Sequence, residues 1–106
     1  MKKFLSLVLA LCMVFAVASF ATAEGKTVKI GMVTDVGGVN DKSFNQTSWE
    51  GLQALAAEDP SFEVNYLESK TDADYQTNIN TFIDEEYDLI ICVGYMLADA
   101  TRAAAE

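Results

Sequence analysis

The chain has 106 residues, of which 16 are acidic, 7 are Lys or Arg and none is His, so its formal net charge is −9. This acidic balance argues against nucleic acid or anionic lipid as a partner, because both attract positively charged proteins. Without histidine, the commonest general base and the commonest zinc ligand are missing. The composition is compatible with an ordinary acidic protein that works outside the cytoplasm.

Residues 1–23 are predicted to be a signal peptide. Lys2 and Lys3 provide a positive start, an apolar run covers residues 4–20, and residues 21–23 read Ala-Thr-Ala. Small residues in this pattern are what a signal peptidase accepts at its cleavage site. Cleavage there predicts an exported protein, located in the periplasm, at the cell surface or in the medium.

The two cysteines bear on lipid attachment and on disulfides. Cys12 would be the lipidated residue of a lipoprotein, but Leu11 stands where a small residue is usual, and the apolar run continues past the cysteine. A cysteine within the signal core is therefore the favoured interpretation, and lipid attachment has poor support. After cleavage only Cys92 remains, so a disulfide within the chain is excluded.

Strand and helix patterns alternate along the rest of the chain. Alternating apolar residues predict strands over residues 28–34 and 62–69, and a continuous apolar run within 87–95 predicts a third strand covered on both faces. Helical spacing predicts helices over 43–59, over 71–86 and from 96 onward. Strand–helix–strand units of this length imply right-handed βαβ crossovers. The predicted fold class is α/β with a parallel sheet.

The starts of the first two helices carry capping patterns, and the first also carries an aromatic residue. Ser43 with Gln46 three residues later is a capping-box pattern, as is Thr71 with Asp74 at the second helix. Phe44 opens the apolar face of the first helix, so spacing alone favours a position in the core for this ring.

Ligands of open parallel sheets bind beyond the carboxyl ends of the strands. The loops at 35–42, 69–71 and 94–97 should meet there. In the first loop, two adjacent glycines suit either a tight turn or a ligand close to the backbone. Asp41 suits either a helix cap or a ligand contact.

The third loop and the residues after it offer weaker candidates. Tyr95 can present a ring or a hydroxyl at this edge, and Asp99 suits either a helix start, where the macrodipole favours an acid, or a ligand contact. Cys92 is expected to be a small core residue.

No catalytic, metal or cofactor site is predicted. The first loop matches neither common glycine-rich phosphate motif, and its aspartates would repel phosphate. Asp35 and Asp41 lack the further carboxylates that calcium sites generally need. Neither Ser43 nor Ser69 has a base partner in a recognisable motif.

Three segments together resemble the basic membrane protein (BMP) family of ABC-transporter substrate-binding proteins, which includes purine nucleoside receptors. They are KIGMVTDVGGVNDKSFNQTSWEGL, ESKTDADYQTNI and YDLIICVGYMLADA, and the pattern D-x-G-G-x-x-D-x-x-F-N spans Asp35 to Asn45. The resemblance implies a two-lobed, periplasmic-binding-protein-like (type I) fold. Residues 24–106 would be the N-terminal part of the first lobe, which would be incomplete in this chain.

The resemblance also implies roles for individual residues. In nucleoside-binding members, aromatic rings from both lobes hold the base, and carboxylates bind the ribose and base. Phe44 would be a stacking ring, Asp41 and Asn45 polar contacts, and Asp35 a contact or loop organiser. The full set of ligand-binding candidates is Asp35, Asp41, Phe44, Asn45, Tyr95 and Asp99.

The implied function is capture of a nucleoside, with a purine favoured, by a monomeric, non-enzymatic subunit that delivers it to ABC permease subunits. One alternative keeps the fold and changes the ligand to a sugar or another small polar metabolite. Another is a secreted nucleoside hydrolase with Asp35 and Asp41 around a metal, although the denser aspartate cluster of such enzymes is missing. Many family members are lipoproteins, whereas Cys12 lacks a good lipobox.

Overall fold

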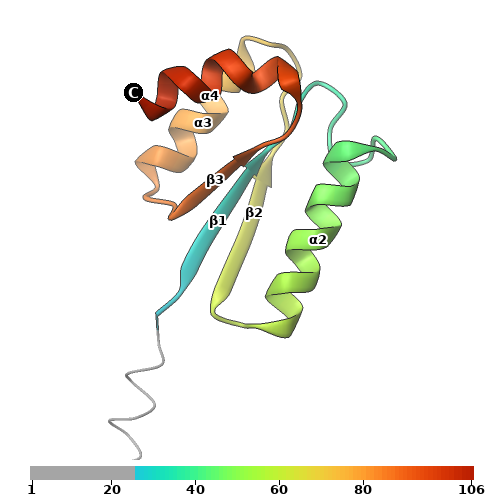
Figure 1. The fold of residues 1–106 in the computed structure, drawn as a ribbon, viewed down its shortest axis with the longest axis vertical. Coiled ribbons are helices and arrows are strands. Elements are labelled where there is room, and N and C mark those ends of the chain that lie inside the picture. The colour runs from blue at the N-terminus through green and yellow to red at the C-terminus, as the bar shows by residue number, and fades with distance from the viewer. Residues whose placement is uncertain (1–25) are drawn as a thin grey trace, which may run out of the picture.

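The computed structural model describes residues 26–106, so the predicted signal peptide and Cys12 lie outside the described residues. Three parallel strands, β1 (Val28–Val33), β2 (Phe62–Leu67) and β3 (Leu89–Cys92), form a sheet in the order β2-β1-β3 (Figure 1). The connecting helices are α2 (Phe44–Glu58), α3 (Asp74–Asp84) and α4 (Ala98–Ala105), with a short 3-10 helix, η1 (Tyr95–Leu97), before α4. The predicted α/β class with parallel βαβ units is confirmed.

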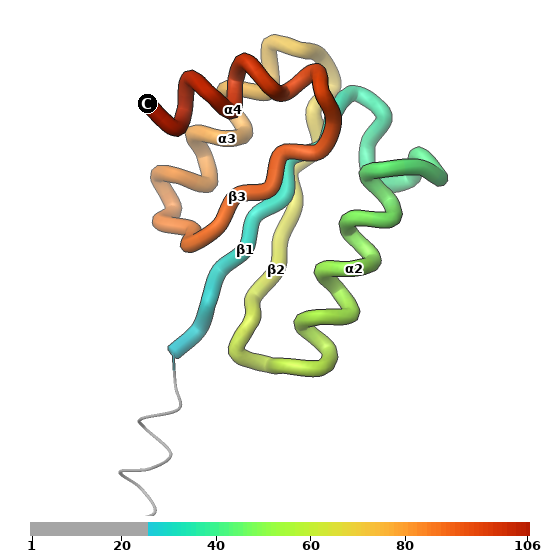
Figure 2. Tube along the Cα trace, in the orientation of Figure 1, coloured from blue at the N-terminus to red at the C-terminus, as the bar shows by residue number. Residues whose placement is uncertain are grey.

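Helices cover both faces of the sheet. Side chains of β1 alternate, so Ile30 and Met32 pack toward α2, where they meet Leu52. Val33 packs on the opposite face with Ile79 of α3, and α4 also lies on that side (Figure 2). Within residues 26–106, no helix is long and apolar enough to cross a membrane.

The centre of β1 is in unusually close contact with α3. A Cβ atom at Gly31 would lie 2.7–2.8 Å from three ring carbons of Phe82, whose side chain is almost completely buried. The ring therefore rests directly on the strand backbone. Burial of such a side chain stabilises a fold by about 1.5–3 kcal/mol.

The third strand differs from its prediction. β3 is shorter than the apolar run, and Leu89 at its start is half exposed. The four residues of β3 are exposed or half-buried, so neither face of the strand is completely covered, and within the described residues β3 pairs only with β1 as an edge strand. Complete coverage of this strand was therefore wrong for residues 26–106. An apolar run indicates that a strand is hydrophobic, but it does not show which strands and helices pack against it.

The cap of α2 also differs from its prediction. Ser43 makes no side-chain capping hydrogen bond. Instead, Asp41 Oδ1 accepts hydrogen bonds from the backbone N–H groups of Ser43 (2.9 Å) and Gln46 (3.0 Å), and its Oδ2 accepts from that of Asn45 (3.1 Å). The Gln46 side chain accepts from the Lys42 N–H at 3.0 Å. A carboxylate offers two charged acceptors to the free N–H groups of a helix start, so it replaces the hydroxyl.

The second capping pattern is half confirmed. Asp74 Oδ2 accepts hydrogen bonds from the backbone N–H groups of Thr71 (3.1 Å) and Lys70 (2.9 Å). The Thr71 side chain forms no capping hydrogen bond with α3. The acid of the pattern therefore holds the loop before α3, and the hydroxyl does not.

Candidate functional site

The direction of chain winding reverses between β1 and β3. β2 lies on one side of β1 and β3 on the other, and the connecting helices α2 and α3 cover opposite faces. The crevice at such a switch point, beyond the carboxyl ends of the strands, is where open α/β sheets bind ligands. The loops after β1 and β3 flank this position.

The three predicted loops do meet at this edge. Asp35 follows β1, and its Oδ2 lies 3.1 Å from the place where a Cβ of Gly94 would be, after β3. The backbone N–H of Ser69, after β2, donates to Thr34 Oγ1 at 3.2 Å. Thr34 and Ser69 are both buried, so this contact joins the ends of two strands beneath the loops.

Asn45 connects the two aspartates of the first loop. Its Nδ2 donates to Asp35 Oδ1 at 2.7 Å and to Asp41 Oδ2 at 3.0 Å. Asp35 Oδ1 also accepts from the Gly37 N–H at 2.9 Å. The Asn45 side chain is 0% exposed, and its Oδ1 has no hydrogen-bond partner among the described residues. The Asn45 amide therefore holds one carboxylate at the start of the loop and one at its end.

Asp41 is held in its ionised form. Partial desolvation, which acts to raise the pKa of this carboxyl, is outweighed by hydrogen bonds from the backbone N–H groups of Gln46, Ser43 and Asn45 and from the Asn45 side chain. The pKa of Asp41 is therefore below its ordinary value. The structure establishes the cap role of Asp41, and contact with a ligand remains a prediction.

Phe44 is not a core residue. Its side chain is 78% exposed, whereas the next residue, Asn45, occupies the buried position in the first turn of α2. The interpretation favoured by spacing alone was therefore wrong, because the buried face of α2 begins one residue later. The ring lies at the carboxyl edge of the sheet, next to the loop that carries both aspartates.

Apolar exposure is concentrated at this edge. Among residues 26–106, the exposed large hydrophobic side chains here are Val36, Phe44, Tyr95 and Met96, and Tyr95 is 89% exposed. Exposed apolar patches rimmed by polar groups mark ligand or partner sites. The edge thus offers ring and aliphatic surface beside hydrogen-bond acceptors.

Asp99 is less closely connected to the site. It lies in the first turn of α4 and is almost fully exposed, 3.8 Å from the Arg102 guanidinium. It makes no hydrogen bond with Asp35 or Asp41 in the structure. This position fits a helix-start acid, and its role as a ligand contact stays a prediction.

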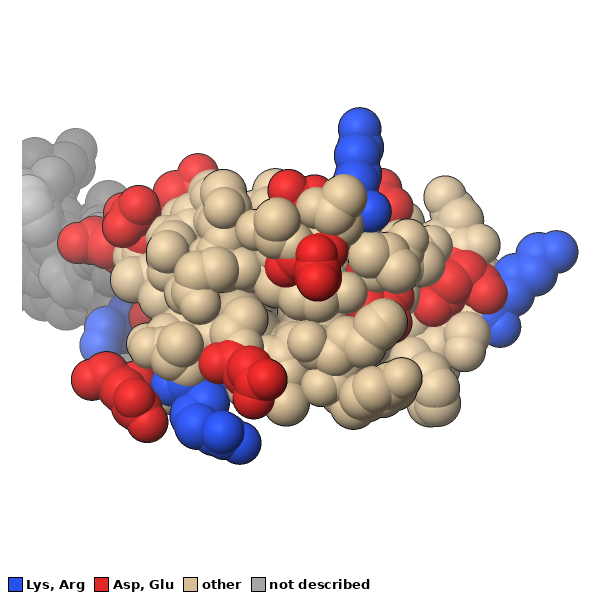
Figure 3. All heavy atoms as spheres, turned by 90° about the horizontal axis from the view of Figure 1, so that it is seen from above, with Lys and Arg blue, Asp and Glu red and all other residues tan. Residues whose placement is uncertain are grey.

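Carboxylates dominate the charge of this end of the molecule. Figure 3 looks down on it from above and shows acidic side chains spread over the surface, with basic side chains toward the margins. A surface of this kind favours ligands that donate hydrogen bonds and disfavours anions. Residues 26–106 contain no group of three His, Cys, Asp or Glu that could hold a metal ion.

Two side chains near the loops were not among the site residues predicted from the sequence. Glu68 follows β2, and its Oε2 accepts a hydrogen bond from the Val39 N–H at 3.3 Å. The signal for it was available, because Glu68 continues the alternation of Phe62, Val64 and Tyr66 toward the α2 face. Tyr75 of α3 is buried, and this burial, helped by the charges of Asp35 and Asp72, raises the pKa of its hydroxyl.

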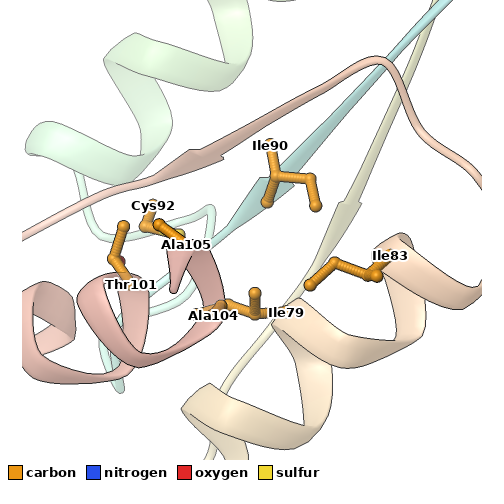
Figure 4. Close-up of a pocket in the computed structure, with 7 residues that line it drawn as sticks. All are labelled: Ile79, Ile83, Ile90, Cys92, Thr101, Ala104 and Ala105. Atoms are coloured by element: carbon orange, nitrogen blue, oxygen red, sulfur yellow. The ribbon is translucent and has the colours of Figure 1, made fainter.

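A separate apolar cavity lies away from these polar groups. It has a volume of about 210 Å³, and Figure 4 shows that its lining comes from α3, β3 and α4. The lining residues are Ile79, Ile83, Ile90, Cys92, Thr101, Ala104 and Ala105. The Thr101 hydroxyl already donates to the Leu97 carbonyl at 2.7 Å. The cavity has little to fix the orientation of a polar ligand, so it is not the candidate site. Cys92 is half-buried in this apolar lining, as expected of a small packing residue.

Curated relatives match the chain over most of its described part. The "CD4+ T-cell-stimulating antigen" of Listeria monocytogenes is 49% identical over 87 residues, which are 78% of this chain and 24% of that protein. The "ABC transporter nucleoside-binding protein BmpA" of Lactococcus lactis is 42% identical over 93 residues, which are 84% of this chain and 26% of that protein. The chain thus spans about a quarter of the length of these relatives.

A solved structure and a family match complete the comparison. A fragment of a Peptoclostridium difficile 630 protein described as a lipoprotein has a TM-score of 0.63 and 24% identity, over 74% of this chain and 64% of that chain. This likeness concerns the fold. Residues 28–106 match the Bmp family, described as "ABC transporter substrate-binding protein PnrA-like". The chain therefore belongs to the Bmp family of PnrA-like ABC transporter substrate-binding proteins.

Proposed function

We propose that the protein containing this chain binds a nucleoside, with a purine base favoured, and presents it to an ABC importer. The observation that carries the proposal is the exposed Phe44 ring beside the Asp35–Asn45–Asp41 cluster at the switch point of the sheet. A nucleoside combines a flat base with a ribose rich in hydroxyl donors. The site combines an exposed ring with ionised acceptors.

The expected contacts follow from the chemistry of the two parts. Stacking of a base on an aromatic ring contributes about 1–3 kcal/mol in proteins that bind single-stranded nucleic acid. Ribose hydroxyls donate to carboxylates in charge-assisted hydrogen bonds, which are stronger than neutral ones. Both hydrogen bonds that Asp35 accepts from residues 26–106 go to Oδ1, so Oδ2 has acceptor capacity left for a ligand hydroxyl or N–H.

The remaining ligand-binding candidates would have secondary roles in the site. Tyr95 provides a second exposed ring at the same edge, and Asn45 holds both aspartates in place. We place Asp99 at the margin of the site, because its contacts are with α4. In a two-lobed protein, of which residues 24–106 would form part of the first lobe, an opposing lobe would cover this edge and complete the ligand's contacts.

The biological setting belongs to the same proposal. The name of the Lactococcus lactis relative describes nucleoside binding, and membership of the family implies delivery of a small molecule to permease subunits. We infer that the protein is exported after cleavage of residues 1–23, is monomeric, and binds its ligand without changing it chemically.

Calorimetry on the complete mature protein tests the ligand class. Guanosine, inosine and adenosine are titrated in parallel with their 5′-nucleotides and with ribose. We expect the nucleosides to bind and the nucleotides to bind much more weakly, because phosphate would meet a carboxylate-rich edge. Binding of ribose without binding of any nucleoside would show that the ligand is a sugar and that the base is not recognised.

Phe44→Ala tests the stacking role. We expect nucleoside affinity to fall by about 1–3 kcal/mol, roughly 5- to 150-fold, with the unfolding transition unchanged because the ring is exposed. Leu89→Ala is the matched control, since Leu89 is an exposed apolar residue at the opposite end of the sheet. Equal affinities of wild type and Phe44→Ala would remove Phe44 from the site.

A further inference from the structure

The loop between β1 and α2 carries most of the candidate site, so the residues that hold it determine the site's geometry. Its first part is fixed by Asp35 and its last part by Asp41 at the start of α2. Between them the chain passes Gly38 and Val39, close to the end of β2. The contact that holds this middle part involves Glu68.

The position of Glu68 follows from strand alternation. Phe62, Val64 and Tyr66 face α2, and the next residue of that series is Glu68, directly after β2. Its carboxylate is therefore on the side of the sheet where the loop passes. Glu68 Oε2 accepts a hydrogen bond from the Val39 N–H at 3.3 Å. The Val39 side chain is buried in the core beneath this contact.

Gly38 shows how closely the carboxylate approaches the loop. Its φ is +69°, and a Cβ atom at this position would overlap Glu68 Oε2. This backbone conformation favours glycine, and the absence of a side chain at this position leaves room for the carboxylate against the loop backbone. The loop backbone and Glu68 thus fit together without space between them.

The backbone of Glu68 is itself held in place. Asn78 Nδ2 donates to the Glu68 carbonyl and to Ser69 Oγ, both at 3.1 Å. Ser69 is buried, and its N–H donates to Thr34 Oγ1 at 3.2 Å. The ends of β1 and β2 and the helix α3 therefore fix the segment from which the Glu68 side chain extends.

We propose that Glu68 is a positioning residue, which holds the β1–α2 loop by accepting a hydrogen bond from the Val39 backbone N–H. This contact keeps Asp35, Asp41 and Phe44 in their ligand-binding arrangement. The effect on ligand affinity rests on the proposed function, whereas the effect on the loop does not. Glu68 Oε1 has no hydrogen-bond partner in residues 26–106, so the side chain acts through one oxygen.

Two measurements on the complete mature protein test this role. The first is amide hydrogen exchange at Val39, and the second is calorimetric affinity for guanosine and inosine. Glu68→Ala removes the acceptor, and we expect exchange at Val39 to accelerate roughly 10-fold or more and affinity to fall roughly 5- to 30-fold. Glu68→Gln keeps an acceptor oxygen and should restore both values to within about 3-fold of wild type. Glu63→Ala is the control, because Glu63 is an exposed glutamate of the preceding strand β2 whose side chain makes no hydrogen bond with the loop.

Each other outcome is decisive. Unchanged exchange at Val39 in Glu68→Ala would overturn the proposal, and a loss of affinity with unchanged exchange would instead make Glu68 a direct ligand contact. A Glu68→Gln protein that behaves like Glu68→Ala would show that the N–H acceptor is not what matters. If the wild type binds no nucleoside, the proposed function fails, and exchange at Val39 alone then decides whether Glu68 holds the loop.

Discussion

The contact between Gly31 and Phe82 gives a sharp prediction about stability. Gly31→Ala would add a Cβ atom 2.7–2.8 Å from three carbons of the Phe82 ring, closer than such carbon atoms approach in folded proteins. The ring is 2% exposed and packed on every side, so it cannot rotate away into solvent. The strand and α3 would have to move apart.

The size of the effect is set by two opposing contributions. Overpacking of a well-packed core costs about 1–3 kcal/mol, and contact with three atoms of a rigid ring places this case in the upper half of that range. Replacement of glycine by alanine recovers about 0.5–1 kcal/mol, since it restricts the unfolded chain. The expected net loss is about 1–2.5 kcal/mol in the free energy of unfolding.

Urea unfolding followed by circular dichroism measures this loss. Gly51→Ala is the matched control, because Gly51 is exposed within α2 and a Cβ there would have no neighbour within 4 Å. We expect that variant to gain about 0.5–1 kcal/mol, the opposite sign. A Gly31→Ala protein as stable as wild type would refute the reasoning, because it would mean that the sheet and α3 are not in direct contact.

Two further predictions concern buried or capping polar groups. Tyr75→Phe should change the free energy of unfolding by less than about 1 kcal/mol, because the hydroxyl lies near the Val36 backbone without a well-aligned hydrogen bond; a larger loss in urea unfolding would reveal a bond at that position. Asp41 has a folded-state pKa below its ordinary value of 3.8, so its contribution to stability is present above that value and is lost as the pH falls through the folded-state pKa. The urea midpoints of wild type and Asp41→Asn should therefore differ near pH 6 and converge toward about pH 2; a difference that stays constant over this range would exclude a role for the charge.

The order of elements was predictable because it depends on local patterns. Alternation in 28–34 and 62–69 and helical spacing between them are properties of short segments, and the parallel sheet follows from the lengths of the connections. The convergence of loops at the carboxyl edge followed from the same topology. These features need no knowledge of side-chain positions.

The details of the site were not predictable in the same way. Phe44 and Asn45 are adjacent, and apolar character favoured the wrong one for the buried position, since the amide is buried in order to bind two carboxylates. That arrangement requires Asp35 and Asp41 to approach one side chain from different parts of a loop. Spacing along the sequence carries no information about such an approach. The hydrogen bond from the Val39 N–H to Glu68 is equally unpredictable from spacing.

The open side of β3 affects how a sample of the isolated segment 26–106 would behave. Its sequence Leu-Ile-Ile-Cys contains no charge and no proline, which are the usual means of blunting a strand edge. The unpaired peptide groups there are a template for the addition of another strand. Self-association through this edge would rise with protein concentration, so spectra of the isolated segment would report its state of assembly as well as its fold.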